Sequence, residues 1–373
     1  MITFLHGADF HLDSPFSSLP PEQAAERRAE QRALFSSLAL LAEDVDLVFL
    51  AGDLFDGARV YPETVECIRQ TLGQIKAPVF IAPGNHDPMS YRSPYHQVRW
   101  PTNVHIFDTE TVTSVTLPHL QCVVYGAGFS GSICQRSLLE GFCAPEDGRR
   151  HLMVLHGEAG REEGLYNPIT IEEVAQSKLD YLALGHIHQS SGGCRMAGRT
   201  AYAWPGCPQG RGFDETGEKG IFRGRMEEDI TLEFIPMAKH RYWEQTVSLS
   251  GETPPLEEIL SALPQETEQD IYRITLIGES GPEGLDLDEL QQALFDRVYH
   301  LILRDRTELR KDVWLRAGED TLTGLFLQRM RQKLAAADTE QEKQQLQKAV
   351  RFGLAALEGR EDPMPLGANG KGR

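Results

Sequence analysis

Five short apolar runs alternate with helical stretches in the first two thirds of the chain. The runs are Ile2–Leu5, Leu47–Leu50, Val79–Ile81, Leu152–Leu155 and Tyr181–Leu184. Each run has the length and the branched or aromatic content of a buried strand. Between the first three runs, Pro21–Glu43 and Pro62–Gln74 carry apolar residues at helical spacing. This order predicts an α/β fold with a largely parallel sheet and helices outside it.

Polar residues of the kind that bind metals follow all five runs. They are Asp9 and His11, Asp53, Asn85 and His86, His156, and His186 and His188. Sites in α/β sheets lie beyond the carboxyl ends of the strands. We therefore expect the five loops to converge on one point at one edge of the sheet.

The individual motifs differ in how specific they are. Asp9-Phe10-His11 is expected to be extended, which would turn both ligand side chains to the same side. Taken alone, however, this motif is better explained by a strand-end Asp that caps a turn beside a surface His. Asp53 could equally be a helix N-cap. Gly84-Asn85-His86-Asp87 is more specific, because Asn, His and Asp in a row after a glycine are an unusual choice for a mere turn. Gly185-His186-Ile187-His188 is also more specific, because two histidines after an apolar strand are costly as simple core residues.

Together the candidate ligands offer carboxylate, amide and imidazole donors. That inventory suits a hydrolytic site with two divalent metal ions, Mn²⁺, Fe, Zn or Mg, rather than a thiolate site. Asp53 is the best candidate for a carboxylate that bridges the two ions. His86 would stabilise charge or protonate the leaving oxygen, with Asp87 as its orienting partner.

The order of these motifs resembles that of the calcineurin-like metallophosphoesterase superfamily, over about residues 1–240. The resemblance implies a two-sheet sandwich flanked by helices. It places Asp9, His11, Asp53 and His188 on one metal, and Asp53, Asn85, His156 and His186 on the other. It also implies that His86 is the catalytic histidine, supported by Asp87, and that Mn²⁺ is the cofactor of the nuclease members.

Three segments look like the SbcD-type DNA repair exonucleases, and within them a YhaO-like bacterial branch. They are Leu5–Asp13, Ala51–Asp56 and Trp204–Phe213, the last followed by Glu215 and Gly217–Gly220. The resemblance implies a DNA exonuclease or endonuclease that works with a coiled-coil, SMC-like ATPase (SbcC-like), and it leaves room for a homodimer. Asp56 stands where archaeal and eukaryotic relatives carry a histidine linked to exonuclease action, so phosphodiester hydrolysis is more secure than exonuclease polarity.

The chain beyond the nuclease domain at residues 1–240 is expected to be a smaller α+β C-terminal region. Capping or linker strands are predicted over 241–285, a helical region over 286–362, and a disordered tail over 363–373. The helices are expected over Leu287–Leu303 and Asp320–Glu358. The apolar face of the second stretch either packs on its own domain, which is favoured, or docks a partner's coiled coil.

Binding to DNA requires cations near the site, and Arg92, Arg99 and Arg211 are the candidates. Tyr91, Tyr95 and Trp100 lie between or beside the first two and could stack on bases. A basic stretch over Arg195–Arg225 could bind phosphates, although ordinary solvated charge explains any single residue as well. The net charge of -18 argues against nonspecific binding over the whole surface, but not against a nuclease.

Two further readings stay open. The chain could be a metallophosphatase or a nucleotide phosphodiesterase of the same superfamily, or a non-catalytic scaffold for a partner ATPase, which could lack bound metal. The six cysteines form no C-x-x-C pair and read as reduced thiols. No signal peptide and no apolar run of membrane-spanning length is evident, so a cytoplasmic protein without membrane contact is expected.

Overall fold

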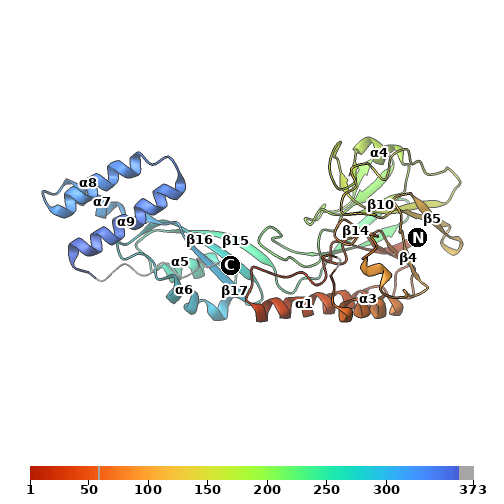
Figure 1. Ribbon diagram of the computed structural model, residues 1–373, viewed down its shortest axis with the longest axis horizontal. Helices are drawn as coiled ribbons and strands as arrows, with labels where there is room; N and C mark the ends of the chain where they lie inside the picture. The colour runs from red at the N-terminus through yellow and green to blue at the C-terminus, as the bar shows by residue number, and fades with distance from the viewer. Residues whose placement is uncertain (58, 361–373) are drawn as a thin grey trace. The chain divides into compact units, whose positions relative to one another are not determined.

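The computed structural model describes residues 1–57 and 59–360, so the predicted tail over 363–373 lies outside the described residues. The chain divides into two compact units, Met1–Lys239 and His240–Arg373 (Figure 1). Among the described residues, the helices are too short or too polar to cross a lipid bilayer.

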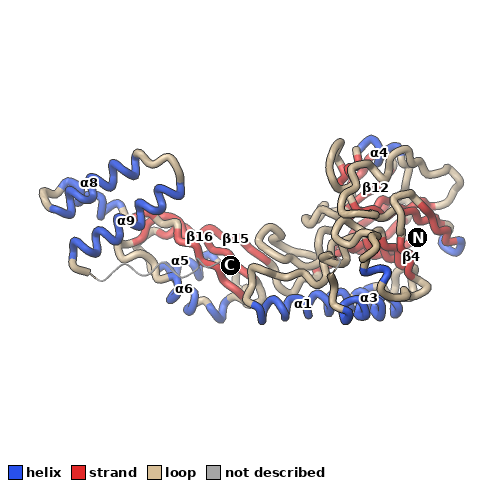
Figure 2. The backbone as a smooth tube through the Cα atoms, in the orientation of Figure 1, coloured by secondary structure: helices blue, strands red, loops and turns tan. Residues whose placement is uncertain are grey.

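The first unit contains two six-stranded sheets (Figure 2). The first has the order β14 (Ile230–Pro236), β13 (Gly220–Met226), β1 (Ile2–Gly7), β2 (Leu47–Leu50), β3 (Val79–Ile81), β4 (Val104–Ile106). The second has the order β11 (Arg195–Ala197), β12 (Thr200–Ala203), β10 (Tyr181–Gly185), β7 (Arg150–His156), β6 (Cys122–Gly126), β5 (Thr113–Leu117). β1 to β4 are parallel, as are β6, β7, β10 and β12. Antiparallel strands extend the first sheet beyond β1 and both ends of the second sheet.

The two sheets face each other across an apolar core that includes Phe4, Phe49 and Phe80 from one sheet and Val154 and Tyr181 from the other. Helices cover the outer faces. The helices are α1 (Pro21–Ser36), α2 (Leu38–Leu41) and α3 (Pro62–Gln74) over the first sheet and α4 (Ile171–Gln176) over the second. Figure 1 shows α1 and α3 along the lower side of this unit and α4 at its top. The expected two-sheet sandwich flanked by helices is confirmed.

All five predicted runs are strands, but they do not belong to one sheet. β1, β2 and β3 lie in the first sheet, whereas β7 and β10 lie in the second. The antiparallel strands β13 and β14, which come late in the unit, return to the first sheet and pair beside β1. An apolar run shows that a strand is buried on both faces, but not which of two stacked sheets it joins.

His6 on β1 joins the two sheets through a polar contact inside the core. Its Nε2 donates to the carbonyl oxygen of Leu184 (2.9 Å), and its Nδ1 accepts from the hydroxyl of Tyr181 (2.9 Å). A carbonyl only accepts, so this network requires a proton on Nε2, and in the neutral ring Nδ1 accepts from the hydroxyl. Complete burial lowers the pKa of His6 to about 3.

We expect His6 to make the first unit less stable in mild acid. An unfolded histidine takes up a proton below its ordinary pKa of about 6.5, but folded His6 does not, so its contribution is present above that pH and is lost as pH falls towards 3. The loss between pH 7 and 5.5 is about 1 kcal/mol. Urea unfolding of metal-stripped His6→Phe should lack this loss, and the exposed-site control His119→Gln should keep it; equal pH dependence in wild type and His6→Phe would contradict the prediction.

The second unit has a parallel sheet in the order β15, β16, β17, with β18 beside the end of β16. Its elements are β15 (Tyr242–Leu249), α5 (Pro255–Ala262), β16 (Ile271–Ser280), α6 (Leu287–Ala293), β17 (His300–Asp305), β18 (Glu308–Leu309), α7 (Lys311–Leu315), α8 (Leu322–Ala335) and α9 (Glu340–Glu358). One apolar cluster joins the sheet to α5 and α6, and another joins β18 to α7, α8 and α9.

The predicted helix over Leu287–Leu303 is wrong in its second half. α6 ends at Ala293, and His300–Asp305 is strand β17. Leu301 and Leu303 point into the same core as α6, and two buried residues at spacing two fit a strand. The predicted stretch Asp320–Glu358 is two helices, α8 and α9.

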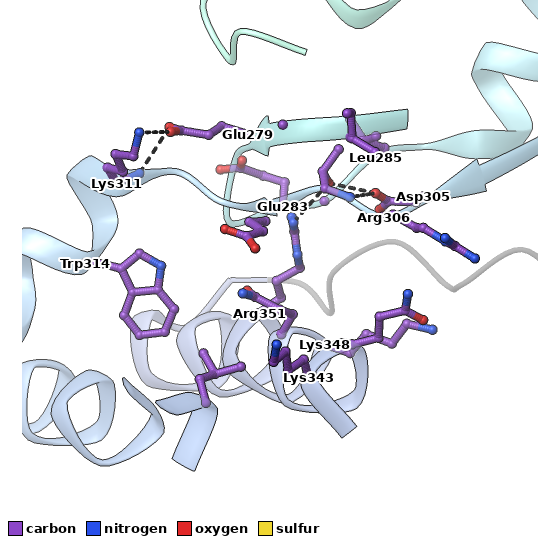
Figure 3. A pocket seen from close by; sticks show the side chains of 18 of the residues that line it. Glu279, Glu283, Leu285, Asp305, Arg306, Lys311, Trp314, Lys343, Lys348 and Arg351 are labelled. Carbon is purple, nitrogen blue, oxygen red and sulfur yellow. Dashed lines mark hydrogen bonds and ion pairs between the residues drawn. The ribbon is translucent and has the colours of Figure 1, made fainter. Parts of the chain in front are cut away.

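A cavity of about 1380 Å³ lies in the second unit, between the end of β16 and helices α7, α8 and α9 (Figure 3). Residues of both charges and the side chain of Trp314 line it. Arg351 extends from α9 to the carbonyl of Gly281 and the hydroxyl of Ser280. All its lining residues belong to the second unit, so it contains none of the candidate metal ligands.

Candidate metal centre

The seven candidate metal ligands form one cluster at the carboxyl ends of strands from both sheets. Neighbouring donor atoms connect them as follows: Asp9 Oδ1–His188 Nε2 4.0 Å, His188 Nε2–His11 Nε2 3.1 Å, His11 Nε2–Asp53 Oδ2 3.7 Å, Asp53 Oδ2–His156 Nε2 3.4 Å, His156 Nε2–Asn85 Oδ1 3.0 Å and Asn85 Oδ1–His186 Nδ1 3.1 Å. The convergence expected from the sequence is present, although the loops come from two sheets rather than one.

The loops that carry the ligands are not extended. Asp9 (φ 54°), His11 (φ 44°), Asp53 (φ 51°) and His186 (φ 89°) all have positive φ. The expectation that Asp9-Phe10-His11 is an extended segment is therefore wrong. Positive φ is unfavourable for residues with a Cβ and persists where surrounding contacts enforce it.

Hydrogen bonds between the loops enforce this backbone. The amide of Asp9 donates to Gly52 O (3.0 Å), and the amide of His11 donates to Asp53 O (2.9 Å). The amide of His186, from the other sheet, donates to Asp9 Oδ1 (3.0 Å). Gln31 on α1 donates to the carbonyl of His11 (3.1 Å). The loops that follow β1, β2 and β10 thus hold one another in place through hydrogen bonds that do not involve a metal ion.

The glycines of two motifs allow a close approach to the β2 loop. A Cβ at Gly84 would lie 2.2 Å from Asp53 Oδ1, and one at Gly185 would lie 2.0 Å from the carbonyl of Ala51. Real Cβ atoms do not approach so closely, so both positions exclude a side chain. The motif glycines serve packing against the site rather than a turn.

Asp53 lies between the two groups of ligands. Its Oδ2 faces His11 on one side and His156 on the other, while its Oδ1 accepts from the amide of His86 (2.9 Å). Burial opposes ionisation of Asp53, but His156 and the other histidines outweigh burial and lower its pKa. Against its own burial, the Asp53 charge raises the pKa of His156 to about 9. The Asp53 carboxylate therefore favours positive charge at the position of His156.

The donor set fits divalent cations. His156 Nδ1 donates to Ala51 O (2.8 Å), and the Nδ1 atoms of His11 and His188 face the carboxylates of Asp56 (3.0 Å) and Glu215 (2.7 Å). With those protons on Nδ1, the Nε2 lone pairs face the cluster. Two nitrogens that are each about 2.1 Å from a shared cation lie about 3.0 to 3.4 Å apart for ligand angles between a right angle and the tetrahedral angle, and the 3.1 Å between His11 and His188 falls in this range.

His86 stands beside the ligands with its side chain 42% exposed. Its ring centroid is 4.7 Å from that of His11, and it could join His11 and Asp53 as a ligand. The carboxylate facing its ring is Asp56 (Nδ1–Oδ1 3.7 Å), not Asp87 as the sequence suggested. The buried Asp87 instead accepts from the amides of Gly84, Asp53, Leu54 and Phe55 and from the hydroxyl of Tyr95, so it fastens the β2 and β3 loops together.

The profile of the calcineurin-like phosphoesterases matches residues 2–190. The chain belongs to this family. Metallophosphoesterases use divalent metal ions, and three groups of His and Asp in this phosphoesterase could each hold one ion. The expected resemblance is thereby confirmed.

Two curated proteins and one solved structure are similar to parts of this chain. The uncharacterized metallophosphoesterase YhaO of Bacillus subtilis is 29% identical over an alignment of 343 residues that covers 82% of each chain. The SbcD component of the SbcCD nuclease of Rhodobacter capsulatus is 32% identical over 112 residues, 28% of this phosphoesterase and 26% of that protein. Among solved structures, purple acid phosphatase PPD1 of yellow lupin seeds covers 63% of this chain and 51% of its own, with 13% identity and a TM-score of 0.40.

The candidate DNA contacts of the phosphoesterase differ in their surroundings. Arg92 and Arg99 are exposed, and within residues 1–57 and 59–360 neither pairs with a carboxylate. Arg211 is engaged by Asp56 and Glu215. In the basic stretch, several cations bind internal partners: Lys219 donates to His188 O, Arg223 pairs with Asp44, and Arg199 pairs with Asp180.

Two residues next to the ligands have no role predicted from the sequence. There, Asp56 marks only a departure from relatives, and Glu215 is only part of a matching segment. The structure places both against ligand histidines. A signal was present: Arg211 and Glu215 are opposite charges four residues apart in a glycine-rich segment, and a charge that becomes buried needs a partner.

Proposed function

We propose that this chain is a two-metal phosphodiester hydrolase that cleaves DNA with Mn²⁺. The observation that carries the proposal is the position of Asp53 Oδ2, which faces His11 on one side and His156 on the other, so one carboxylate is shared by two groups of donors. Asp9, His11, Asp53 and His188 would hold one ion, and Asp53, Asn85, His156 and His186 the other. The bound ions would polarise the phosphoryl oxygens and activate a water molecule as the nucleophile.

The protein's own groups supply the remaining steps. His86 is exposed beside the ligands, so it can reach the phosphodiester and give a proton to the leaving oxygen. Asp53 Oδ1 accepts a hydrogen bond from the His86 amide, and this bond fixes the backbone from which the His86 side chain extends. The buried carboxylate of Asp87 accepts from backbone amides of the loops after β2 and β3. These bonds hold His86 and Asp53 at a fixed distance from each other.

Two observations support DNA as the substrate. A relative that matches part of the chain is a subunit of a nuclease. Tyr91, Arg92 and Arg99 are exposed in the connection between β3 and β4, which follows His86. Exposed arginines without carboxylate partners can contact phosphates, and an exposed tyrosine can stack on a base. We propose Arg92 and Arg99 as these contacts.

A cleavage assay with defined DNA tests the substrate. With Mn²⁺, the purified protein should degrade single- or double-stranded DNA, and cleavage should stop when a chelator removes the ions. Labelling either end of the strand separates exonuclease from endonuclease products and gives the polarity. Cleavage of small phosphomonoesters or cyclic nucleotides with intact DNA would reject the DNA assignment and favour a phosphatase or nucleotide phosphodiesterase.

We further propose a coiled-coil, SMC-like ATPase as the partner. The SbcCD relative is named as one subunit of a complex, and α8 exposes Leu322 and Leu325 by 69% and 56%. Paired leucines on an exposed helix fit helix-on-helix docking. Leu322→Glu with Leu325→Glu should abolish co-elution with an ATPase encoded beside this chain, whereas Leu40→Glu, at a leucine that is also 69% exposed, should not. Co-elution of the double variant would exclude this docking face.

A further inference from the structure

We infer that Asp56, Arg211 and Glu215 form a positioning unit that aims His11 and His188 at one of the two metal positions. The inference rests on the proposed two-metal function and gives Arg211 a role other than the DNA contact expected from the sequence. None of the three would touch the metal or the substrate. They would act through the two histidines.

The three side chains and the two histidines form a continuous set of contacts. Arg211 Nη1 donates to Asp56 Oδ1 (3.0 Å), and Arg211 Nη2 donates to Glu215 Oε1 (2.6 Å). Asp56 Oδ1 lies 3.0 Å from His11 Nδ1, and Glu215 Oε1 lies 2.7 Å from His188 Nδ1. One guanidinium therefore links two carboxylates that each face a ring nitrogen.

This arrangement sets the tautomer of both rings. An ionised carboxylate only accepts hydrogen bonds, so each Nδ1 is the donor, and in the neutral ring each Nε2 then has a free lone pair. Arg211 Nη2 also lies 3.1 Å from His188 Nδ1, but the contact of His188 Nδ1 with Glu215 Oε1 is shorter, at 2.7 Å. The two Nε2 atoms face each other at 3.1 Å, where two lone pairs repel unless a cation lies between them. Hydrogen bonds to the second nitrogen of a ligand histidine fix its orientation and raise its basicity.

Arg211 is built into the loop rather than free for a phosphate. Its own amide donates to Glu215 Oε2 (2.7 Å), and the Glu215 amide donates to Gly212 O (3.1 Å), which closes a tight turn. Glu215 is only 3% exposed. The buried Glu215 carboxylate and the half-buried Asp56 carboxylate need a fixed counter-charge, and the planar fork of arginine can bind both at once.

Metal titration of stripped protein tests this role without reference to catalysis. Wild type should bind two Mn²⁺ ions in calorimetry. Arg211→Leu and Glu215→Gln should bind one ion with unchanged affinity and the other about 10- to 100-fold more weakly. The control Arg223→Leu, which removes an ion pair with Asp44 elsewhere in the first unit, should leave both affinities unchanged.

Second-site backgrounds identify which ion is affected. In Asn85→Ala, which weakens the position of His156 and His186, Arg211→Leu should still cost about 10- to 100-fold in affinity for the remaining ion. In His188→Ala, which weakens the other position, Arg211→Leu should change nothing.

Equal effects in the two backgrounds, or no effect in Asn85→Ala, would overturn the inference. If Arg211→Leu does not unfold cooperatively, Glu215→Gln and Arg211→Lys in the same backgrounds decide by the same criterion. Failure of wild type to bind two ions would instead reject the proposed function.

Discussion

Asp53→Asn is expected to abolish turnover, with a loss of about 10³-fold or more, which corresponds to about 4 kcal/mol of transition-state stabilisation. The substitution replaces the charged Oδ2 that faces both groups of ligands. Without that charge neither position keeps its full set of anionic donors. Metal analysis after dialysis should therefore find fewer than two ions per chain.

Asparagine is the appropriate replacement at this position. Asp53 has φ 51°, a left-handed conformation that Asn adopts more readily than most residues. Its amide oxygen can still accept from the His86 amide, which now bonds to Oδ1. A loss of activity in Asp53→Asn can then be assigned to charge rather than to a collapsed loop.

The matched control is Asp46→Asn. Asp46 Oδ2 accepts from the amide and the hydroxyl of Thr3 at 2.8 and 2.9 Å, and these contacts serve β1 rather than the centre. We expect a stability loss of about 1 kcal/mol with turnover within about 2-fold of wild type. Two ions and normal turnover in Asp53→Asn would exclude a bridging role.

His86→Gln should lower kcat by about 10²- to 10⁴-fold, the usual size of a general-acid contribution. Two ions should remain bound, because the seven proposed ligands are intact. The defect should shrink sharply for a p-nitrophenyl phosphodiester, because nitrophenolate leaves without a proton. Comparison of kcat on this ester and on DNA, together with metal analysis, measures all three effects.

His96→Gln is the control for His86→Gln, because His96 is exposed and lies in the same connection between β3 and β4. It should leave kcat and metal content unchanged. A fall in metal content in His86→Gln would mean that the ring is a ligand, which its position near His11 and Asp53 permits. An equal loss on both substrates would also contradict proton donation.

The sequence was most informative about which loops meet. Apolar runs followed by Asp, Asn or His predicted the participants at the centre, because only a few strand ends of a folded sheet lie close together. It was less informative about how the loops are built. The positive φ of Asp9 and His11 arises from hydrogen bonds to Gly52 and Asp53, more than 40 residues away in the chain, and no local pattern encodes a bond across that separation.

The hydrogen-bond partners of buried charged side chains could not be predicted from the sequence either. Asp87 follows His86 directly, so adjacency suggested that it orients the ring. In the structure its carboxylate turns inward and accepts from backbone amides around Asp53. The side chains of two consecutive residues can point to opposite sides of the backbone as readily as to the same side. Only the fold decides whether Asp56 or Asp87 faces the His86 imidazole.

The centre draws its ligands from both sheets, and that origin has a mechanical consequence. Each proposed metal position combines residues that follow β1, β2 or β3 with a histidine that follows β7 or β10. A bound cation would therefore cross-link the two sheets, whose other contacts with each other are mostly apolar. Sliding of one layer against the other by about an ångström would break coordination at both positions together, so the loaded unit should resist shear and open in a single concerted event.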